Sequence, residues 1–400
     1  MAEHAGKPKV RFAGFTETWE QRNTSYLGNF FKGQGYSKAD LLPDGTPIIL
    51  YGQLYTNYQF TITEVNTYAQ KKKNTILSKG NEVIVPASGE TAEDIARASA
   101  VRKKGVILGG DLNIIVPIPS MNAEFFALSL SNGFPQKKLA QKAQGKSVVH
   151  IHNSDIQEIS ITYPSLEEQN RIASFFRHLD RLITLHQRKR GRLENIKKAM
   201  LEKMFPKNGA DVPEVRFVGF TEAWEQRKFE KIAIRSSAMA VCSRSLPGVE
   251  YEDIISEQGI LNKDIKTKRA VKIGIKFLPG DVLFGKLRPY LKNWLLPDFT
   301  GVAVGDFWVL QPSEIDSQYL YYLIQTPAFQ EVSNQSTGTK MPRADWNLVA
   351  NSMFFLPQND DEQTCIGTFF RQLDRLITLH QRKVALLQNI KKACLEKMFV

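Results

Sequence analysis

Two stretches of this chain each occur twice. Residues 8–23, PKVRFAGFTETWEQRN, return as residues 213–228 with 12 of 16 positions identical, and residues 168–205 return as residues 362–399 with 28 of 38 identical and no gap. The segments between them have largely diverged. The repeat therefore restricts the chain to two similar halves, each with a shared frame, a variable insert and a shared helix.

The longer repeated stretch has the pattern of an amphipathic helix. Ser165 and Glu168 form a helix-start signature, in which the serine side chain accepts from the glutamate backbone N–H and the carboxylate reaches back to the cap; Asn359 and Glu362 repeat it. Apolar residues then recur at alternating spacings of three and four, which predicts a coiled-coil seam of about four heptads. The predicted seam residues are Ile172, Phe175, Leu179, Leu182, Leu193, Ile196 and Met200, and Ile366, Phe369, Leu373, Leu376, Leu387, Ile390 and Cys394.

Each predicted helix has one apolar stripe, so packing the two helices against each other hides both stripes. Antiparallel pairing is the more economical arrangement, and it places His186 near His380 as a polar layer that could fix the register. The alternative, that each histidine points to solvent, stays open. Pro206 and Gly209 end the first helix after roughly 38 residues, or about 57 Å.

The chain is basic, because 53 Lys plus Arg residues stand against 41 Asp plus Glu residues and give a formal net charge of +12. This excess favours a polyanionic partner such as nucleic acid over an acidic small substrate. Cys242, Cys365 and Cys394 lack metal-ligand spacing, which fits a reducing compartment. With no signal-peptide core and no run approaching the ~18 apolar residues of a membrane span, we expect a cytoplasmic protein that does not contact membranes.

The two inserts retain a faint similarity. GNEVIVPASGE at 80–90 is similar to GDVLFGKLRPY at 280–290, and GVILGGDLNIIVP at 105–117 is similar to GVAVGDFWVLQP at 301–312. Short apolar runs between Gly and Pro predict strands joined by tight turns, while EFFALSLSNG and QYLYYLIQTPAFQE predict helices. The expected fold class is therefore α+β, with a pseudo-two-fold internal repeat.

Candidate DNA contacts are the basic, polar and aromatic side chains of the predicted turns, because Arg can fork onto a guanine edge and Lys commonly contacts phosphates. For any one of them, a solvated charge or a structural tyrosine is the simpler interpretation. The candidates are Tyr51, Gln53, Tyr55, Lys71, Lys72, Lys73, Ser88, Glu90, Thr91 and Lys146 in the first insert, and Lys286, Arg288, Tyr290, Lys340 and Arg343 in the second.

If each insert is a reader at one end of a helical rod about 50 Å long, the two readers could face half-sites about one helical turn of DNA apart, or ~34 Å. Because the inserts differ, such a target would be split and asymmetric. Trp19 and Trp224, which repeat with their frame, are predicted packing anchors.

No catalytic motif stands out in the sequence. The chain has no Asn-Pro-Pro-aromatic or Asp-Pro-Pro-aromatic tetrapeptide of the amino-methyltransferase type, and no Gly-rich cofactor turn follows a clear strand. His150 and His152 alternate along a predicted strand, but without a third ligand we interpret them as surface residues and not as a metal site. We expect no catalytic, cofactor-binding or metal-binding residues in this chain.

Taken together, several of these motifs closely resemble the specificity subunit of type I restriction-modification systems. They are the repeated VRF.GF...WE opening, the EEQ.RI..FF..LD..I helix start, the KK..L.KMF ending, the SGET turn, the GD.LF.KLRPY segment and GTKMPR. They occur in the family's order from about residue 8 to residue 399.

The resemblance implies two globular target-recognition domains, each reading half of a bipartite asymmetric DNA sequence, joined by two helices packed as an antiparallel coiled coil that sets the gap. It also implies a non-catalytic adaptor that binds double-stranded DNA, two methyltransferase subunits and two restriction subunits, with S-adenosylmethionine, ATP and Mg on those partners. The expected segments are 1–163 (first repeat segment and recognition domain), 164–206 (first helix), 207–356 (second repeat segment and recognition domain) and 357–400 (second helix). Alternatives are a protein-binding helical scaffold and the recognition part of a split methyltransferase.

The repeated stretches also predict the partner stoichiometry. Their outward positions are the same in both halves although the inserts differ, and two identical surfaces can hold two copies of one methyltransferase subunit. The positions are Arg11, Phe15, Glu17, Arg177 and Arg181, with the copies Arg216, Phe220, Glu222, Arg371 and Arg375.

Overall fold

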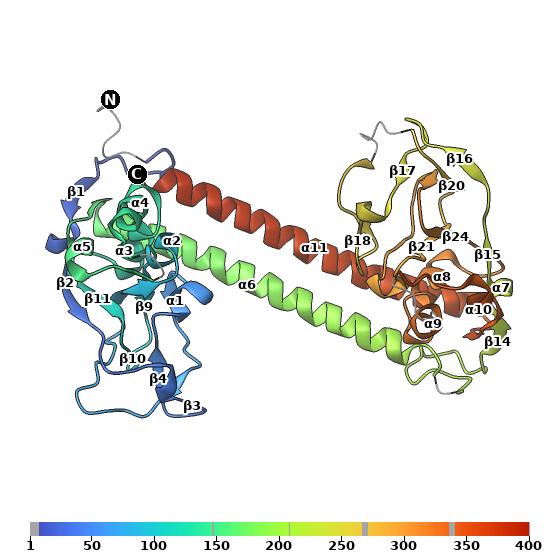
Figure 1. Cartoon of the computed structure of the whole chain (residues 1–400), viewed down its shortest axis with the longest axis horizontal. Coiled ribbons are helices and arrows are strands. Elements are labelled where there is room, and N and C mark those ends of the chain that lie inside the picture. The colour runs from blue at the N-terminus through green and yellow to red at the C-terminus, as the bar shows by residue number, and fades with distance from the viewer. Residues whose placement is uncertain (1–7, 146–147, 208, 266–270, 336–340, 400) are drawn as a thin grey trace. The chain divides into compact units, whose positions relative to one another are not determined.

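The computed structural model of this chain describes residues 8–145, 148–207, 209–265, 271–335 and 341–399. It consists of two compact units, unit 1 with residues 1–185 and 383–400, and unit 2 with residues 186–382 (Figure 1). Each unit thus contains one insert together with pieces of both long helices. Unit 1 is discontinuous in sequence and unit 2 is one continuous range, and each boundary falls within a long helix and not between the segments expected from the sequence.

In unit 1, two short strands close the insert at its ends. Strand β1 (Glu20–Asn23) pairs antiparallel with β13 (Ser160–Tyr163), so the chain enters and leaves the insert at one place. Trp19 precedes β1 and is buried edge-on against Phe125, with ring centroids 5.8 Å apart. This confirms the prediction that Trp19 is a packing anchor.

The insert of unit 1 is built from small sheets covered by short helices. One sheet has the order β2 (Gly28–Lys32), β11 (Leu112–Pro117), β7 (Glu82–Pro86), β9 (Ser99–Val101) and β5 (Thr61–Ile62). A second has the order β10 (Ile107–Leu108), β4 (Thr46–Ile49), β6 (Tyr68–Ala69) and β3 (Leu41–Leu42), and β12 (Val149–His150) pairs with β8 (Ser88–Gly89). The helices are α1 (Gln53–Thr56), α2 (Ala92–Ile95), α3 (Ala123–Leu130), α4 (Gly133–Lys142) and α5 (Asn153–Gln157).

Unit 2 repeats the plan. Strand β14 (Glu225–Lys228) pairs with β25 (Met353–Leu356) and closes the insert, and Trp224 is buried beside it. The sheets have the orders β15 (Ala233–Arg235), β24 (Phe307–Pro312), β21 (Val282–Gly285), β22 (Trp294–Leu295), and β16 (Met239–Val241), β20 (Ile273–Phe277), β23 (Gly301–Ala303), β17 (Gly248–Val249), with a hairpin of β18 (Ile254–Ile255) and β19 (Ile260–Leu261). The helices are α7 (Phe229–Ile232), α8 (Ser317–Leu323), α9 (Pro327–Ser333) and α10 (Trp346–Asn351).

Two strand pairs occupy equivalent places in the two inserts. Strands β7 and β11 pair antiparallel in unit 1, as β21 and β24 do in unit 2, and the parallel pair β4 and β10 corresponds to β17 and β23. The similarity detected between residues 80–90 and 280–290 therefore reflects one shared strand, and the turns follow it as expected. In the strand pairing Pro86 lies opposite Leu112, and Gly285 lies opposite Phe307. Pro86 therefore corresponds to Gly285, one residue earlier than in the match between the two sequence segments.

The long helices α6 (Leu166–Lys203) and α11 (Asp360–Met398) pack antiparallel within each unit. In unit 1, Asp180 accepts from Lys391 at 2.6 Å and Phe176 contacts Phe399, so α11 runs toward the start of α6. Figure 1 shows α11 ending among the elements of unit 1. The predicted antiparallel coiled-coil pairing is confirmed.

Unit 2 contains the other antiparallel contact. Lys197 lies 2.7 Å from Asp374, and the Nδ1 atoms of His186 and His380 lie 2.8 Å apart. The predicted histidine layer therefore exists, and one ring must donate while the other accepts. This hydrogen bond gives each half-buried ring a polar partner, and it can form only when the two helices pair in this register.

Part of the predicted seam is wrong. Ile172, Leu179 and Leu373 are buried as expected, but Leu182 is 42% exposed and Leu376 is 43% exposed. Ile196 and Ile390 are exposed as well, whereas the unpredicted Phe176, Ile183, Phe370 and Val384 are buried. The shift arises because both helices also pack against the inserts. Phe176, for example, belongs to the same apolar cluster as Phe125, so the buried stripe follows the insert core as well as the partner helix.

Each long helix is tied to its frame by a buried ion pair. Arg11 donates from Nε and Nη2 to Glu168 at 2.6 and 2.7 Å, and Arg216 makes the same fork onto Glu362 at 2.7 and 2.8 Å. Both carboxylates are essentially inaccessible to solvent. The sequence predicted that each glutamate carboxylate reaches back to the cap of its own helix. That prediction is wrong, because each carboxylate binds an arginine of the repeated frame instead. Arg11 and Arg216 are also mostly buried and do not lie on an outward surface.

None of the helices in the described ranges combines the length and apolar character that a membrane span requires.

We predict that Arg216→Ala lowers the free energy of unfolding of unit 2 by about 3 kcal/mol, because it leaves the buried Glu362 carboxylate without its guanidinium partner. Arg227→Ala is the matched control, since Arg227 pairs with Glu225 on the surface and such pairs contribute about 0–1 kcal/mol. Urea unfolding followed by tryptophan fluorescence measures both. Equal effects of the two substitutions would contradict the assigned role of the buried pair.

Candidate nucleic-acid interface

Each unit contains a loop that leaves the shared antiparallel strand pair and is bridged by a returning segment. We call these the bridged loops: residues 87–91 with 148–151 in unit 1, and residues 286–290 with 341–344 in unit 2. Ser88 forms a backbone bridge with His150 in β8 and β12, and Leu287 forms one with Arg343. The bridged loops bring together sequence segments that are more than 50 residues apart in both units.

Backbone hydrogen bonds show that the two bridged loops are equivalent. In unit 1, Ala87 donates to the carbonyl of Asp111 at 2.8 Å and accepts from Ile151 at 3.0 Å. In unit 2, Lys286 donates to the carbonyl of Asp306 at 2.9 Å and accepts from Ala344 at the same distance. The backbone is thus shared, while the side chains that it carries differ.

The bridged loop of unit 2 is a cluster of charges. Arg343 donates from Nε and Nη2 to the two oxygens of Asp306 at 3.2 and 3.0 Å, and Lys286 Nζ lies 3.8 Å from the same carboxylate. The hydrogen bonds from Arg343 hold the pKa of Asp306 below its ordinary value. Arg288 has a φ of 46°, in the left-handed region, and half-exposed Tyr290 follows it. The structure thus brings four predicted contacts together: Lys286, Arg288, Tyr290 and Arg343.

A tyrosine underlies this loop. Tyr251 donates its hydroxyl to the carbonyl of Leu287, and burial raises the pKa of that hydroxyl to about 12. Tyr251 corresponds to Tyr51 by strand register. Tyr51 lies two residues after the last position of β4 that pairs with β10, and Tyr251 lies two residues after the last position of β17 that pairs with β23. Sequence reasoning selected Tyr51 and missed Tyr251, together with Asp306.

The bridged loop of unit 1 is less charged. The Ser88 hydroxyl, which is buried, lies 3.0 Å from His150 Nδ1. Thr91 is the N-cap of α2, and its hydroxyl accepts from the backbone N–H of Asp94 at 3.1 Å. Glu90 is exposed between them. Of the predicted contacts in this loop that the structure describes, Glu90 and Thr91 are therefore the exposed ones, and the Thr91 hydroxyl is used by the cap of α2.

Helix α1 lies next to the bridged loop of unit 1. The rings of Tyr51 and Tyr55 are 6.3 Å apart, and burial together with the nearby charge of Glu90 raises the pKa of Tyr55. Gln53 donates its amide to Thr67 at 2.7 Å and accepts from the backbone N–H of Leu50. The Gln53 side chain is therefore used to hold the turn before α1.

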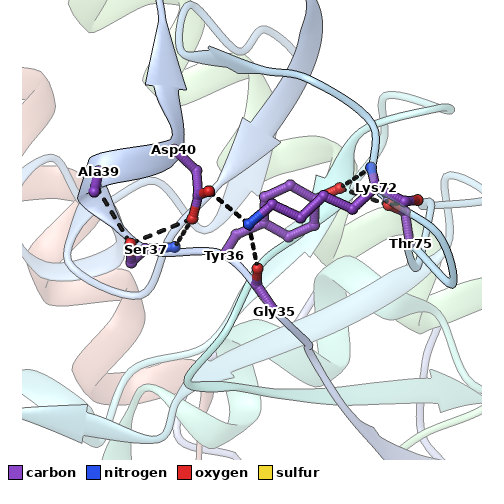
Figure 2. A network of polar contacts seen from close by, with 7 residues as sticks. All are labelled: Gly35, Tyr36, Ser37, Ala39, Asp40, Lys72 and Thr75. Carbon is purple, nitrogen blue, oxygen red and sulfur yellow. Dashed lines mark hydrogen bonds and ion pairs between the residues drawn. The ribbon is translucent and has the colours of Figure 1, made fainter.

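The three consecutive lysines have different environments. Lys72 donates to Asp40 and to the carbonyl of Gly35, and its ammonium lies over the ring of Tyr36 (Figure 2). Its backbone N–H donates to the Tyr36 hydroxyl at 2.8 Å. Lys71 and Lys73 are exposed. The hydrogen bond from Lys72 also lowers the pKa of Asp40, so Lys72 ties two loops together.

Lys146 and Lys340 lie outside the described residues. Within the described part of the chain, no group of three or more His, Cys, Asp or Glu side chains could hold a metal ion.

Comparison with known proteins shows what this chain is similar to. Residues 16–195 match the family described as the type I restriction modification DNA specificity domain. The chain is 23% identical to the type I restriction enzyme MjaVIII specificity subunit of Methanocaldococcus jannaschii, over 94% of this chain and 91% of that protein. It is 22% identical to the EcoDI specificity subunit of Escherichia coli, over 66% of each. The chain is thus similar to the specificity subunits of type I restriction enzymes.

Solved structures share the fold of this chain. The S subunit of a type I system from M. genitalium has a TM-score of 0.61 at 15% identity and covers 98% of this chain, which covers 99% of it. A chain from a structural study of complex assembly and conformational transition of the type I R-M system has a TM-score of 0.51 at 16% identity, with coverages of 95% and 97%. The predicted mixed α+β fold class is confirmed. The matching proteins are named as specificity subunits of type I restriction enzymes, and the matching family model is described as a DNA specificity domain.

We predict that Lys72→Ala lowers the thermal unfolding midpoint of this protein by about 2 °C, because it removes the contacts to Asp40, Gly35 and the Tyr36 ring. Lys71→Ala and Lys73→Ala are matched controls that remove the same charge from exposed neighbours and should leave the midpoint unchanged. A midpoint for Lys71→Ala as low as that for Lys72→Ala would refute this structural assignment.

Proposed function

We propose that this specificity subunit reads a bipartite, asymmetric DNA sequence, with one half-site read by each unit. In this proposal it directs adenine methylation or ATP-dependent cleavage by partner subunits that carry S-adenosylmethionine, ATP and Mg. The observation that carries the proposal is the pair of bridged loops. They share a backbone arrangement in both units and carry different side chains, which is what two readers of different sequences require.

The chemistry of the loops supports different half-sites. The loop of unit 2 offers Arg343, Arg288 and Lys286, and arginine pairs in a fork with the O6 and N7 atoms of guanine. The loop of unit 1 offers Glu90, a carboxylate of the kind that accepts from the cytosine amino group, next to Tyr51 and Tyr55. Lys71 and Lys73 supply exposed positive charge for phosphates.

The long helices support two further parts of the proposal. Their antiparallel pairing, fixed in register by His186 and His380, would set the number of unread base pairs between the half-sites. Their exposed apolar positions would bind partner proteins, since the same positions are exposed in both copies. These are Leu182 and Leu376, Leu185 and Leu379, and Ile196 and Ile390. Repeated surfaces of this kind fit two copies of one methyltransferase subunit.

Methylation-resolved sequencing of the host genome with and without this gene tests the reading function. We expect methylated adenine at one split motif, two short blocks around a fixed gap, that disappears with the gene. A matched strain carrying the gene with the inserts exchanged should exchange the two blocks. If the methylome is unchanged, the next measurement is DNA binding by the assembled complex at several salt concentrations. Binding that does not weaken as salt rises would refute the DNA function in favour of a protein-binding scaffold.

Native mass spectrometry of the purified complex with its cognate methyltransferase subunit tests the stoichiometry. We expect two methyltransferase subunits per chain, and only one after either Leu182→Asp or Leu376→Asp, because a charge in an apolar contact prevents docking. Thr184→Asp, two residues along the helix and so on its opposite face, is the control and should retain two. A wild-type complex with one methyltransferase subunit at saturation would contradict the proposal.

A further inference from the structure

We propose that His150 is a base-reading residue of unit 1, in the position that Arg343 occupies in unit 2. This inference rests on the proposed DNA-reading function. His150 was expected to be an ordinary surface residue of a strand, and no likeness in local sequence connects it with Arg343. The equivalence follows from how the chain pairs with itself in the bridged loops.

The backbone places the two residues at the same position. In unit 1, His150 is bridged to Ser88, which follows the residue whose N–H donates to the carbonyl of Asp111. In unit 2, Arg343 is bridged to Leu287, which follows the residue whose N–H donates to the carbonyl of Asp306. The next residues, Ile151 and Ala344, make the equivalent hydrogen bonds to Ala87 and Lys286.

The alternation of an extended chain fixes which way these side chains point. Ile151 and Ala344 are buried, so the preceding His150 and Arg343 point to the opposite side. His150 is exposed, and the Arg343 side chain is 52% exposed. Both therefore project outward from the bridged loop of their unit.

Each projecting side chain is held by one neighbour. Asp306 holds the guanidinium of Arg343, and the buried hydroxyl of Ser88 engages Nδ1 of His150 at 3.0 Å. This contact leaves Nε2 as the ring nitrogen for a ligand. Since a hydroxyl can donate or accept, Ser88 can support either tautomer, and Nε2 can then donate to guanine or thymine or accept from adenine or cytosine. Ser88 is a positioning residue in this arrangement.

The geometry favours a base edge over a phosphate as the ligand. A neutral imidazole supplies one directed hydrogen bond, whereas the counterion-release contribution of phosphate contacts comes from Lys and Arg charges. One hydrogen bond discriminates less than the two-bond fork of Arg343. The base pair read by His150 should therefore be specified less strictly than the one read by Arg343.

The test is methylation-resolved sequencing of a methylation-free host that expresses the specificity subunit with its cognate methyltransferase subunit. His150→Ala should relax one position in one block of the split motif, with discrimination there falling on the order of tenfold. Arg343→Ala should relax a position in the other block. Ser88→Ala should produce a weaker form of the His150→Ala pattern, and Lys137→Ala, an exposed residue of the same unit, should leave the motif unchanged.

Other outcomes would overturn the inference. Methylation that falls uniformly at all sites after His150→Ala, with an unchanged motif, would indicate a phosphate contact or a structural role. An unchanged motif and unchanged level would show that His150 reads nothing. The unfolding midpoint of each variant separates a loss of folding from a loss of reading. A wild-type chain that directs no split motif would overturn the proposed function itself, which is a different result from a wild-type motif that His150→Ala leaves intact.

Discussion

The fold depends on the buried fork between an arginine of each repeated frame and a glutamate in the first turn of each long helix. Arg11 with Glu168 and Arg216 with Glu362 join segments about 150 residues apart, and both carboxylates are shielded from water. A buried charge left alone is costly, so each half is stable only when its frame and its helix are together. The insert between them starts and ends at one short strand pair, β1 with β13 or β14 with β25, so its exposed positions can change while its core residues that pack on the helix, such as Phe125, keep their place.

This separation explains why the inserts could diverge so far. What the two inserts share is backbone hydrogen bonding around one strand pair and its bridged loop, and backbone bonds place few demands on side-chain identity. The exposed side chains of the loop carry no core packing, so they can vary at little cost in stability. The frame is thus repeated because its contacts are made by side chains. The loop can vary because the contacts that the two loops share are made by backbone atoms.

The sequence predicted the repeat, the helices, their antiparallel pairing and the His186–His380 layer, because each depends on patterns within the two copies of one repeated stretch. It failed where contacts come from elsewhere in the fold. The seam was displaced to Phe176 and Ile183 because the insert core also packs on the helix, and the Lys72 ammonium was taken up by Asp40, which is far from it in sequence. The equivalence of His150 with Arg343 was out of reach for the same reason, since it appears only when strands are paired.

If the bridged loops read DNA as proposed, they also differ in what binding requires of each. Before binding, Arg343 is forked onto Asp306 at an exposed position, where such pairs contribute little to stability and are screened by salt. The ion pair can therefore open at low cost in free energy. Until it opens, it keeps the planar guanidinium of Arg343 ordered, which reduces the conformational entropy that the side chain loses on contact with a base. Asp306 also remains nearby as an acceptor for Arg343, so it can keep one face of the guanidinium oriented while another N–H meets a base edge. In unit 1 the His150 ring is held by the Ser88 hydroxyl, which carries no charge, so the negative charge of that loop lies on Glu90 and not on the group that holds the ring.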